Sequence, residues 1–266
     1  MRAFTDRAVW ITGASSGIGA ALARAFAREG ACLVLSARSQ PRLAEVQAAC
    51  QALGGTAHLL PHDLAQHATL PHKARAALRL AGRIDLLVNN AGIGQRATAL
   101  DTSLAVVERI LSVNFLGAVA LTRAVLPHMI EQGGGHIAVV TSVLGKFGAR
   151  TRSAYAASKH ALHGYFDSLR AELGDRNIRV TLLCLGYVRS EVSIHALDGD
   201  GAEHGRMDRG QARGMDPDRC ARAMIRAVQK GREEVVIGGL LERGAVWLKR
   251  LAPGVLSRLL AGWDPD

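Results

Sequence analysis

Short apolar runs alternate with segments of helical length along the whole chain, and this alternation is the feature that most restricts its fold. Each run is rich in Val, Ile and Leu and lacks the polar residue at every second position that a half-exposed strand would show. Strands that are buried on both faces have this composition. The runs cover residues 8–12, 32–36, 57–60, 84–88, 136–141, 178–184 and 234–237, and they predict a seven-stranded parallel sheet.

The segments between the runs are long enough to form helices, and they span residues 17–30, 41–54, 66–82, 104–132, 153–177 and 217–230. Strands and helices in alternation predict an α/β fold with right-handed crossovers and helices on both faces of the sheet. No linker, composition change or repeat divides the chain, so we expect one domain over residues 1–266. The least regular stretch, 190–216, contains five glycines and is expected to form a substrate lid.

The composition narrows the classes of function. Hydrophobic residues make up 48% of the chain, which excludes disorder as its main state. The net charge is +10, from 33 Lys and Arg against 23 Asp and Glu, but no run of five like charges marks a binding tail. We therefore expect no nucleic-acid partner, while an anionic substrate or cofactor stays open.

The cysteines and histidines point to neither disulfides nor a metal. The four cysteines form no CxxC pair, so we expect free thiols and a reducing cytoplasm. The ten histidines match no metal-binding spacing, and His160 and His163 are interpreted as packing or solvent-exposed residues. No apolar signal sequence precedes residue 8, and no stretch of 18 apolar residues predicts a membrane span.

A glycine-rich loop follows the first expected strand, with the spacing Gly13-x-x-x-Gly17-x-Gly19. In a parallel α/β sheet this turn binds the pyrophosphate of a dinucleotide, because the next helix offers free N–H groups and glycine allows close approach. A plain glycine-rich turn is the alternative interpretation.

The end of the second expected strand favours NADP(H) over NAD(H). Residues 35–38 read Leu-Ser-Ala-Arg and contain no acid to hold a ribose 2′-hydroxyl. Arg38 can instead offer a bidentate contact to a 2′-phosphate, to which Ser15 can add a hydroxyl group. An ordinary solvent-exposed arginine is the alternative for Arg38.

Ser142, Tyr155 and Lys159 form a candidate catalytic group. Tyr155 and Lys159 are four residues apart and share one face of an expected helix. Ser142 follows a strand, at the edge where open α/β sheets bind ligands. A free tyrosine has a pKa of about 10, and we expect the Lys159 ammonium and an oxidised nicotinamide to lower it. Such a phenol can protonate a carbonyl oxygen or deprotonate an alcohol.

Together these motifs resemble the short-chain dehydrogenase/reductase family over about residues 5–240. The resemblance rests on Gly13-x-x-x-Gly17-x-Gly19, Asn89-Asn90-Ala91-Gly92, Asn114, Ser142 and Tyr155-x-x-x-Lys159. It implies a single doubly wound Rossmann-type domain with the strand order 3-2-1-4-5-6-7. It also implies a homodimer or homotetramer formed through the helices 104–132 and 153–177.

The resemblance implies a role for each site residue. Tyr155 is similar to the catalytic acid and base, and Lys159 to the group that lowers its pKa and holds the nicotinamide ribose. Ser142 corresponds to the hydroxyl that orients the carbonyl, and Asn114 to the residue that holds a proton-relay water. For Asn89 and Asn90 the alternative is a pair of side chains that only join loops between strands. The implied cofactor contacts are Gly13, Ser15, Ser16, Gly17, Ile18, Gly19, Arg38, Asp63, Leu64, Asn90, Ala91, Gly92, Tyr155, Lys159 and Val188.

The chain departs from the family after the sixth strand. Leu185 and Ser190 stand where the family usually has Pro and Thr. Leu185 frees φ and adds an N–H group, so we expect a looser loop here. Val188 can still offer backbone groups to the nicotinamide carboxamide.

The chain is also similar to the animal dehydrogenase/reductase member-7 group. This similarity rests on 145–148 (Gly-Lys-Phe-Gly), 152–161 (Arg-Ser-Ala-Tyr-Ala-Ala-Ser-Lys-His-Ala) and 251–254 (Leu-Ala-Pro-Gly). Members of that group act on lipid-like ketones, which implies an apolar or lipid-like substrate.

Residues 240–263 form an amphipathic extension with apolar residues at helical spacing, among them Trp247, Leu251 and Trp263, and basic residues between them. Three interpretations stay open: a membrane-surface element, a lid or partner contact at the substrate mouth, and a helix packed on the domain. We expect it to pack at the substrate mouth and to bring the protein to the inner membrane face.

The resulting hypothesis is a cytoplasmic NADPH-dependent carbonyl reductase, or the reverse alcohol dehydrogenase, with Tyr155 as acid and base. The alternative is an NADP(H)-binding sensor or scaffold protein without turnover. Leu185 favours that alternative, whereas the intact catalytic group, Asn114, Ser142, Tyr155 and Lys159, argues against it.

Overall fold

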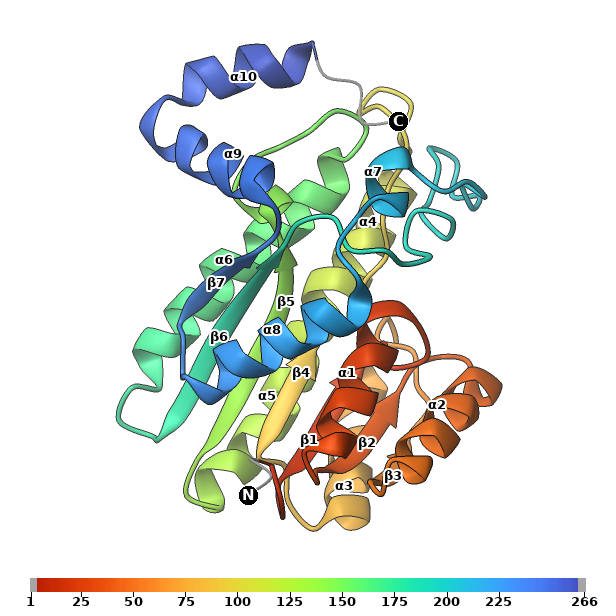
Figure 1. Cartoon of the computed structure of the whole chain (residues 1–266), viewed down its shortest axis with the longest axis vertical. Coiled ribbons are helices and arrows are strands. Elements are labelled where there is room, and N and C mark those ends of the chain that lie inside the picture. The colour runs from red at the N-terminus through yellow and green to blue at the C-terminus, as the bar shows by residue number, and fades with distance from the viewer. Residues whose placement is uncertain (1–3, 263–266) are drawn as a thin grey trace.

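A seven-stranded parallel sheet has the order β3-β2-β1-β4-β5-β6-β7, which confirms the predicted strand order (Figure 1). The computed structural model describes residues 4–262. Every neighbouring pair of these strands is parallel, so their carboxyl ends meet at one edge. The strands are β1 (Ala8–Thr12), β2 (Cys32–Ser36), β3 (Thr56–Leu59), β4 (Leu86–Asn89), β5 (Gly135–Ser142), β6 (Ile178–Leu185) and β7 (Glu234–Ile237).

Helices cover both faces of the sheet, as expected for a doubly wound fold. On one face lie α1 (Gly17–Arg28), α2 (Gln40–Ala52) and α8 (Pro217–Gln229). On the other lie α3 (Leu70–Ala81), α5 (Gly117–Glu131) and α6 (Ser153–Glu172). The remaining helices are α4 (Leu104–Leu111), α7 (Arg209–Ala212), α9 (Leu240–Leu251) and α10 (Pro253–Ala261).

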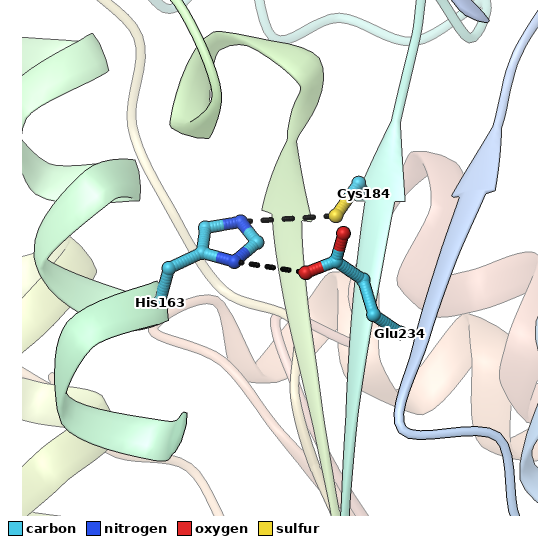
Figure 2. A group of neighbouring side chains, drawn as sticks. All are labelled: His163, Cys184 and Glu234. Carbon is cyan, nitrogen blue, oxygen red and sulfur yellow. Dashed lines mark hydrogen bonds and ion pairs between the residues drawn. The ribbon is translucent and has the colours of Figure 1, made fainter. Parts of the chain in front are cut away.

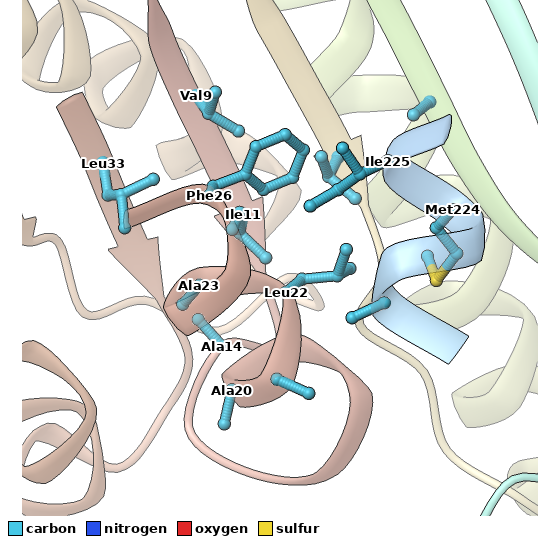
Figure 3. Packing of buried hydrophobic residues seen from close by; sticks show 14 of the residues in the cluster. Val9, Ile11, Ala14, Ala20, Leu22, Ala23, Phe26, Leu33, Met224 and Ile225 are labelled. Carbon is cyan, nitrogen blue, oxygen red and sulfur yellow. The ribbon is translucent and has the colours of Figure 1, made fainter. Parts of the chain in front are cut away.

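Strand β1 lies between two hydrophobic cores, and this position explains why its residues 8–11 are all apolar. Val9 and Ile11 face the core that contains α1 and α8, while Trp10 faces the core under α3, α5 and α6. Side chains of a strand alternate between faces, so a strand covered on both sides needs apolar residues at every position. Phe26 of α1 is buried in the first core beside the residues of α8 (Figure 3).

Two expected helices are interrupted. The helix expected over 104–132 consists of α4 and α5 joined by a π-helical turn, Ser112–Leu116. The extension expected over 240–263 forms α9 and α10, because the backbone of Ala252 is not helical and Pro253 begins a new helix. Trp263 lies outside the described residues.

The stretch 190–216 is irregular but well anchored. Leu197 pairs with Gln95, and Met215 pairs with Val188 in short bridges. Ser193 and Asp208 are buried, and α7 adds one short turn of helix. Its role as a substrate lid stays a prediction.

The expectation that no segment crosses a membrane stays a prediction. By length and composition alone, the helical segment Leu104–Glu131 meets both criteria for a membrane span. A helix that covers a sheet meets them too, and α5 of this helix places Leu121, Val125 and Met129 in the core.

Replacing Phe26 by Ala tests the core on the α1 face. The Phe26→Ala variant should lose about 3–5 kcal/mol of unfolding free energy, because a fully buried ring leaves a cavity. Urea unfolding followed by circular dichroism measures this loss. Leu100→Ala is the control, since that side chain is 98% exposed, and it should change stability by less than about 0.5 kcal/mol. Equal losses in both variants would contradict the packing described here.

Candidate active site

Two adjoining cavities open at the carboxyl edge of the sheet. One, of about 940 Å³, lies over the loop that follows β1, and the other, of about 640 Å³, lies over the end of β5 and the start of α6. We call them the β1 cleft and the β5 pocket. Ile18, Asn90 and Gly92 line both, so a ligand in the cleft can reach into the pocket. Open α/β sheets bind ligands at this edge, where the strand order reverses.

The loop 12–19 forms the floor of the β1 cleft. Gly13 and Gly17 have φ angles of +66° and +50°, a region that favours glycine. A Cβ atom on Gly19 would collide with the carbonyl oxygen of Gly13. Ser16 begins α1 without a side-chain cap, so the first N–H groups of the helix stay available to an anion. The loop therefore fits a pyrophosphate group.

Thr12 and Asn90 fasten this loop to the end of β4. Thr12 Oγ1 accepts hydrogen bonds from the backbone N–H groups of Asn90 at 3.0 Å and Ala91 at 3.1 Å. The Asn90 side-chain amide donates to the carbonyl oxygens of Thr12 at 2.9 Å and Gly13 at 3.3 Å. Asn90 thus stitches the two loops together, and Thr12 shares that work although the motif analysis did not single it out.

The structure gathers the expected cofactor residues in two groups that adjoin each other. The first group lines the β1 cleft and consists of Gly13, Ser15, Ser16, Gly17, Ile18, Gly19, Arg38, Asp63, Leu64, Asn90, Ala91 and Gly92. The second group lines the β5 pocket and consists of Tyr155, Lys159 and Val188. This arrangement suits an elongated dinucleotide with its adenosine end in the cleft and its nicotinamide end at the pocket.

The end of β2 presents a positive charge to the cleft. Arg38 is exposed there, and no ion pair joins it to an acidic residue within 4–262. The neighbouring Arg42, by contrast, pairs with Glu191 at 3.3 Å. Ser36 is buried, and its hydroxyl donates to the carbonyl oxygen of Leu60 at 2.8 Å. The strand end therefore holds an available guanidinium and no carboxylate.

Tyr155, Ser142 and Lys159 meet in the β5 pocket. Tyr155 and Lys159 lie on the first turns of α6, and Ser142 is the last residue of β5. Ser142 lies close enough to the Tyr155 side chain to lower the pKa of its phenol, and both residues line the pocket. Lys159 Nζ donates to the carbonyl oxygen of Val140 at 3.0 Å and lies 5.6 Å from the centre of the Tyr155 ring.

Burial dominates the ionisation of this group. It raises the pKa of Tyr155 above its ordinary value, against the Ser142 hydrogen bond and the positive charges of Arg96 and Arg152, which lower it. Burial also lowers the pKa of Lys159 to about 8. The two arginines add positive charges that the sequence motifs did not indicate, and the expected effect of Lys159 on the pKa of Tyr155 stays a prediction.

Arg96 and Arg152 share one carboxylate, that of Asp208. Arg96 Nε donates to Asp208 Oδ2 at 2.8 Å, and Arg152 Nη2 donates to the same oxygen at 3.2 Å. All three side chains are at most 7% exposed, and both arginines line the β5 pocket. No sequence motif brings these three residues together, because they lie far apart in the chain and match no spacing.

Gln95 positions the helix turn that carries Tyr155. Its Oε1 accepts hydrogen bonds from the backbone N–H groups of Ala154 at 2.7 Å and Tyr155 at 3.3 Å. Its Nε2 donates to Thr102 Oγ1 at 2.8 Å, and the residue is fully buried. Gln95 therefore acts as the cap of α6 from a distant loop, which no local capping signal could reveal.

Asn114 lies in the π-helical turn between α4 and α5, a feature that often marks functional sites. Its Nδ2 donates to the Ile93 carbonyl oxygen and to Ser158 Oγ, both at 3.0 Å. Its Oδ1 accepts from the Ile93 N–H at 2.8 Å. The side chain thus joins this turn to α6 and to the loop after β4, and its expected relay-water role stays a prediction.

The loop after β6 is held more firmly than the sequence suggests. Leu185 continues the strand and pairs with Ser142 of β5 and Ile237 of β7. The carbonyl oxygen of Val188 accepts a hydrogen bond from Gln211 Nε2. The expected loosening at Leu185 is therefore wrong, because its added N–H group belongs to a paired strand.

The last two helices form a wall of the β5 pocket. Leu241, Glu242 and Ala245 of α9 and Leu259 and Leu260 of α10 line it. The same helices pack on Val143 and Phe147, which follow Ser142. The extension thus lies beside the β5 pocket, and its place at a substrate mouth stays a prediction.

A group of three metal-ligand residues lies apart from the pocket, the one such group within 4–262 (Figure 2). His163 Nε2 lies 3.7 Å from Cys184 Sγ, and His163 Nδ1 lies 3.4 Å from Glu234 Oε2. Because a histidine offers one ring nitrogen to a metal, contacts on opposite nitrogens describe a chain of pairs instead. Lys146 Nζ lies 2.6 Å from Glu234 Oε2, so the positive charge that balances this carboxylate comes from a lysine. The His163 and Lys146 contacts lower the pKa of Glu234 to about 2.

Comparison with known proteins agrees with this geometry. Residues 7–199 match the short chain dehydrogenase family. The chain is 42% identical over 262 residues to "Dehydrogenase/reductase SDR family member 7B" of Danio rerio, covering 96% of this chain and 85% of that relative. This relative confirms the similarity to the member-7 group that the motifs indicated.

Solved structures show the same architecture. A metagenomic short-chain oxidoreductase in complex with NADP matches with a TM-score of 0.74 at 30% identity, covering 88% of this chain and 97% of that one. A short chain dehydrogenase/reductase from Burkholderia phymatum in complex with NAD matches with a TM-score of 0.83 at 24% identity, covering 100% and 99%, and supports the fold alone. The chain therefore belongs to the short chain dehydrogenase family and is an oxidoreductase of alcohol or carbonyl substrates that uses a nicotinamide cofactor.

Proposed function

We propose that this protein reduces an apolar ketone with NADPH and catalyses the reverse oxidation of the secondary alcohol. The observation that carries the proposal is that Tyr155 and Ser142 line the β5 pocket side by side with Lys159. It places two hydroxyl groups together at the point where the pocket adjoins a cleft suited to a dinucleotide. Two such donors can hold one carbonyl oxygen.

The two hydroxyl groups have different tasks. Ser142 Oγ accepts a hydrogen bond from the Leu144 N–H at 3.1 Å, which fixes the oxygen and leaves its proton for the substrate carbonyl. Tyr155 donates its proton to the same carbonyl oxygen as negative charge develops there, and accepts it in the reverse direction. Bound NADPH supplies the hydride in this reaction. Lys159 keeps N–H donors beyond its bond to Val140 and is suited to hold the nicotinamide ribose.

The proposed preference for NADPH rests on the end of β2. Arg38 offers an available guanidinium at the β1 cleft, and Ser36 offers no carboxylate to a 2′-hydroxyl. A guanidinium binds a phosphate through two charge-assisted hydrogen bonds, whereas it stabilises a neutral ribose hydroxyl only weakly.

The proposed substrate class follows from the walls of the β5 pocket. Apart from the catalytic hydroxyls and the buried arginines, much of the lining is apolar, from Val143, Leu144, Phe147, Leu241, Leu259 and Leu260. Pockets of this kind bind apolar ligands and use a few polar groups to orient them. A lipid-like ketone, the class implied by the member-7 resemblance, fits this lining.

We also propose that the partner of the helix Leu104–Glu131 is a second copy of this chain. Only 33% of its most apolar window is buried, and Leu104 and Leu116 are exposed. Helices α4 and α6 contact each other, so the two long helices can meet their counterparts together. The four free cysteines support a reducing compartment, and we propose the cytoplasm.

Tyr155→Phe tests the catalytic assignment. The turnover number should fall at least ~100-fold, the low end of general acid catalysis, while NADPH binding is retained. Tyr165→Phe, on the same helix but outside the pocket, is the matched control and should keep its activity. NADPH absorbance with ketones from small diketones to long-chain compounds measures both. Tight NADPH binding by a wild type that reduces none of them would favour the sensor or scaffold without turnover.

Arg38→Gln tests the cofactor preference. A hydrogen bond to a charged group contributes about 1.5–3 kcal/mol, so KM for NADPH should rise by about 10- to 150-fold. KM for NADH should stay nearly unchanged, because no 2′-phosphate is present to lose the contact. Arg28→Gln, exposed and outside the cleft, is the control. Equal affinity of the wild type for both cofactors would disprove the preference.

Arg96→Gln tests the electrostatics at Tyr155. Alcohol oxidation requires the phenolate, so its rate rises with pH through the pKa of Tyr155. Arg96 lowers that pKa, and removing its charge should therefore move the rising limb of the kcat/KM profile to higher pH. Arg96→Lys keeps the positive charge, so the rising part of its kcat/KM profile should stay at the same pH. A limb that moves equally in both variants would show that Arg96 acts through packing alone.

A further inference from the structure

The outer side of α9 and α10 is an apolar surface that the fold leaves uncovered. These helices stand at the end of the molecule beyond the carboxyl edge of the sheet (Figure 1). Leu256 is the one fully buried residue of the two helices within the described part of the chain. Their inner residues, among them Val246 and Leu248, pack on Val143 and Phe147.

Three of the four strongly exposed apolar residues of α9 lie on one face, and the fourth, Leu241, is 89% exposed and lines the β5 pocket. Leu240, Trp247 and Leu251 are separated by seven and four residues, which places them on the same side of a helix. They are 87%, 63% and 76% exposed. On α10, Val255 and Leu259 are exposed and lie one turn apart. A helix with water on its outer side carries polar residues there, so this face is suited to a non-aqueous partner.

The charges of the same surface are positive. Arg243 and Arg250 lie beside the apolar face of α9 with their side chains exposed, and Lys249 and Arg258 are exposed as well. The one acidic residue of α9 and α10 is Glu242, which faces inward and accepts a hydrogen bond from the Tyr187 N–H at 3.4 Å. Within residues 4–262 no ion pair joins these basic side chains to an acidic residue, so the outer surface combines apolar and basic side chains.

We propose that the outer face of α9 and α10 docks on a membrane surface that contains anionic lipids. Leu240, Trp247 and Leu251 enter the boundary between headgroups and acyl chains, and Arg243 and Arg250 meet the lipid phosphates. Trp247 is suited to this boundary because its ring is apolar and its N–H is polar. A second copy of the chain would bring the same basic residues against each other, which disfavours it as the occupant.

The docked orientation places the substrate pocket at the membrane. Leu241, Ala245 and Leu260 line the β5 pocket from the inner side of the helices whose outer side binds lipid. Leu259 lines the pocket and is 60% exposed, so it marks the mouth. An apolar ketone can then pass from the bilayer into the pocket beneath α10. This extension to substrate entry rests on the proposed function, whereas the docking does not.

Co-sedimentation with vesicles tests the docking. The full chain should bind vesicles of phosphatidylcholine mixed with phosphatidylglycerol, bind phosphatidylcholine alone weakly, and lose binding as salt rises. The double variant Trp247→Asp and Leu251→Asp should lose binding to both. The double variant Arg243→Glu and Arg250→Glu should bind the anionic vesicles at least about tenfold more weakly.

Matched changes on α3, at the opposite end of the molecule, are the controls (Figure 1). Leu80→Asp and the double variant Arg75→Glu and Arg79→Glu alter exposed residues there and should bind vesicles as the wild type does. Tyr155→Phe should also bind fully, which separates docking from catalysis. Absence of vesicle binding by the wild type, or equal loss in the α3 controls, would overturn the proposal. The proposal would also be overturned if the wild type formed an oligomer that binds no vesicles, and if the double variant at Trp247 and Leu251 dissociated that oligomer.

Discussion

All strands of the sheet run in one direction, and the position of every functional group depends on that. A parallel sheet brings its carboxyl ends to one edge, so the loop after β1, the loop after β4 and the end of β5 become neighbours. Gly13, Asn90 and Ser142 meet there although long stretches of chain separate them. The helices that return the chain to the other edge cover both faces, which is why the strands must be apolar throughout.

The parts of the site that could be predicted from sequence are those where one backbone requirement selects one residue type within a short segment. Gly19 is such a case, since any side chain there collides with the Gly13 carbonyl group. The spacing of Tyr155 and Lys159 is another, because one helical turn places both on the same face. Unbroken apolar runs revealed the strands in the same way, since burial on both faces acts on every residue of the run.

The parts that could not be predicted depend on contacts between distant segments. Arg96, Arg152 and Asp208 meet only after the chain has folded, and Gln95 caps a helix that begins far along the sequence. The interpretation of Leu185 failed for a related reason. The apolar run predicted a strand that ends at residue 184, which leaves Leu185 in the loop, but the partners that hold it belong to β5 and β7.

Helices α9 and α10 pack against the carboxyl edge of the sheet from outside. They pack on Val143 and Phe147, contribute to the β5 pocket, and add no strand to the sheet. A change in these two helices therefore alters the wall of the β5 pocket, while the paired strands that hold Ser142 in place keep their partners.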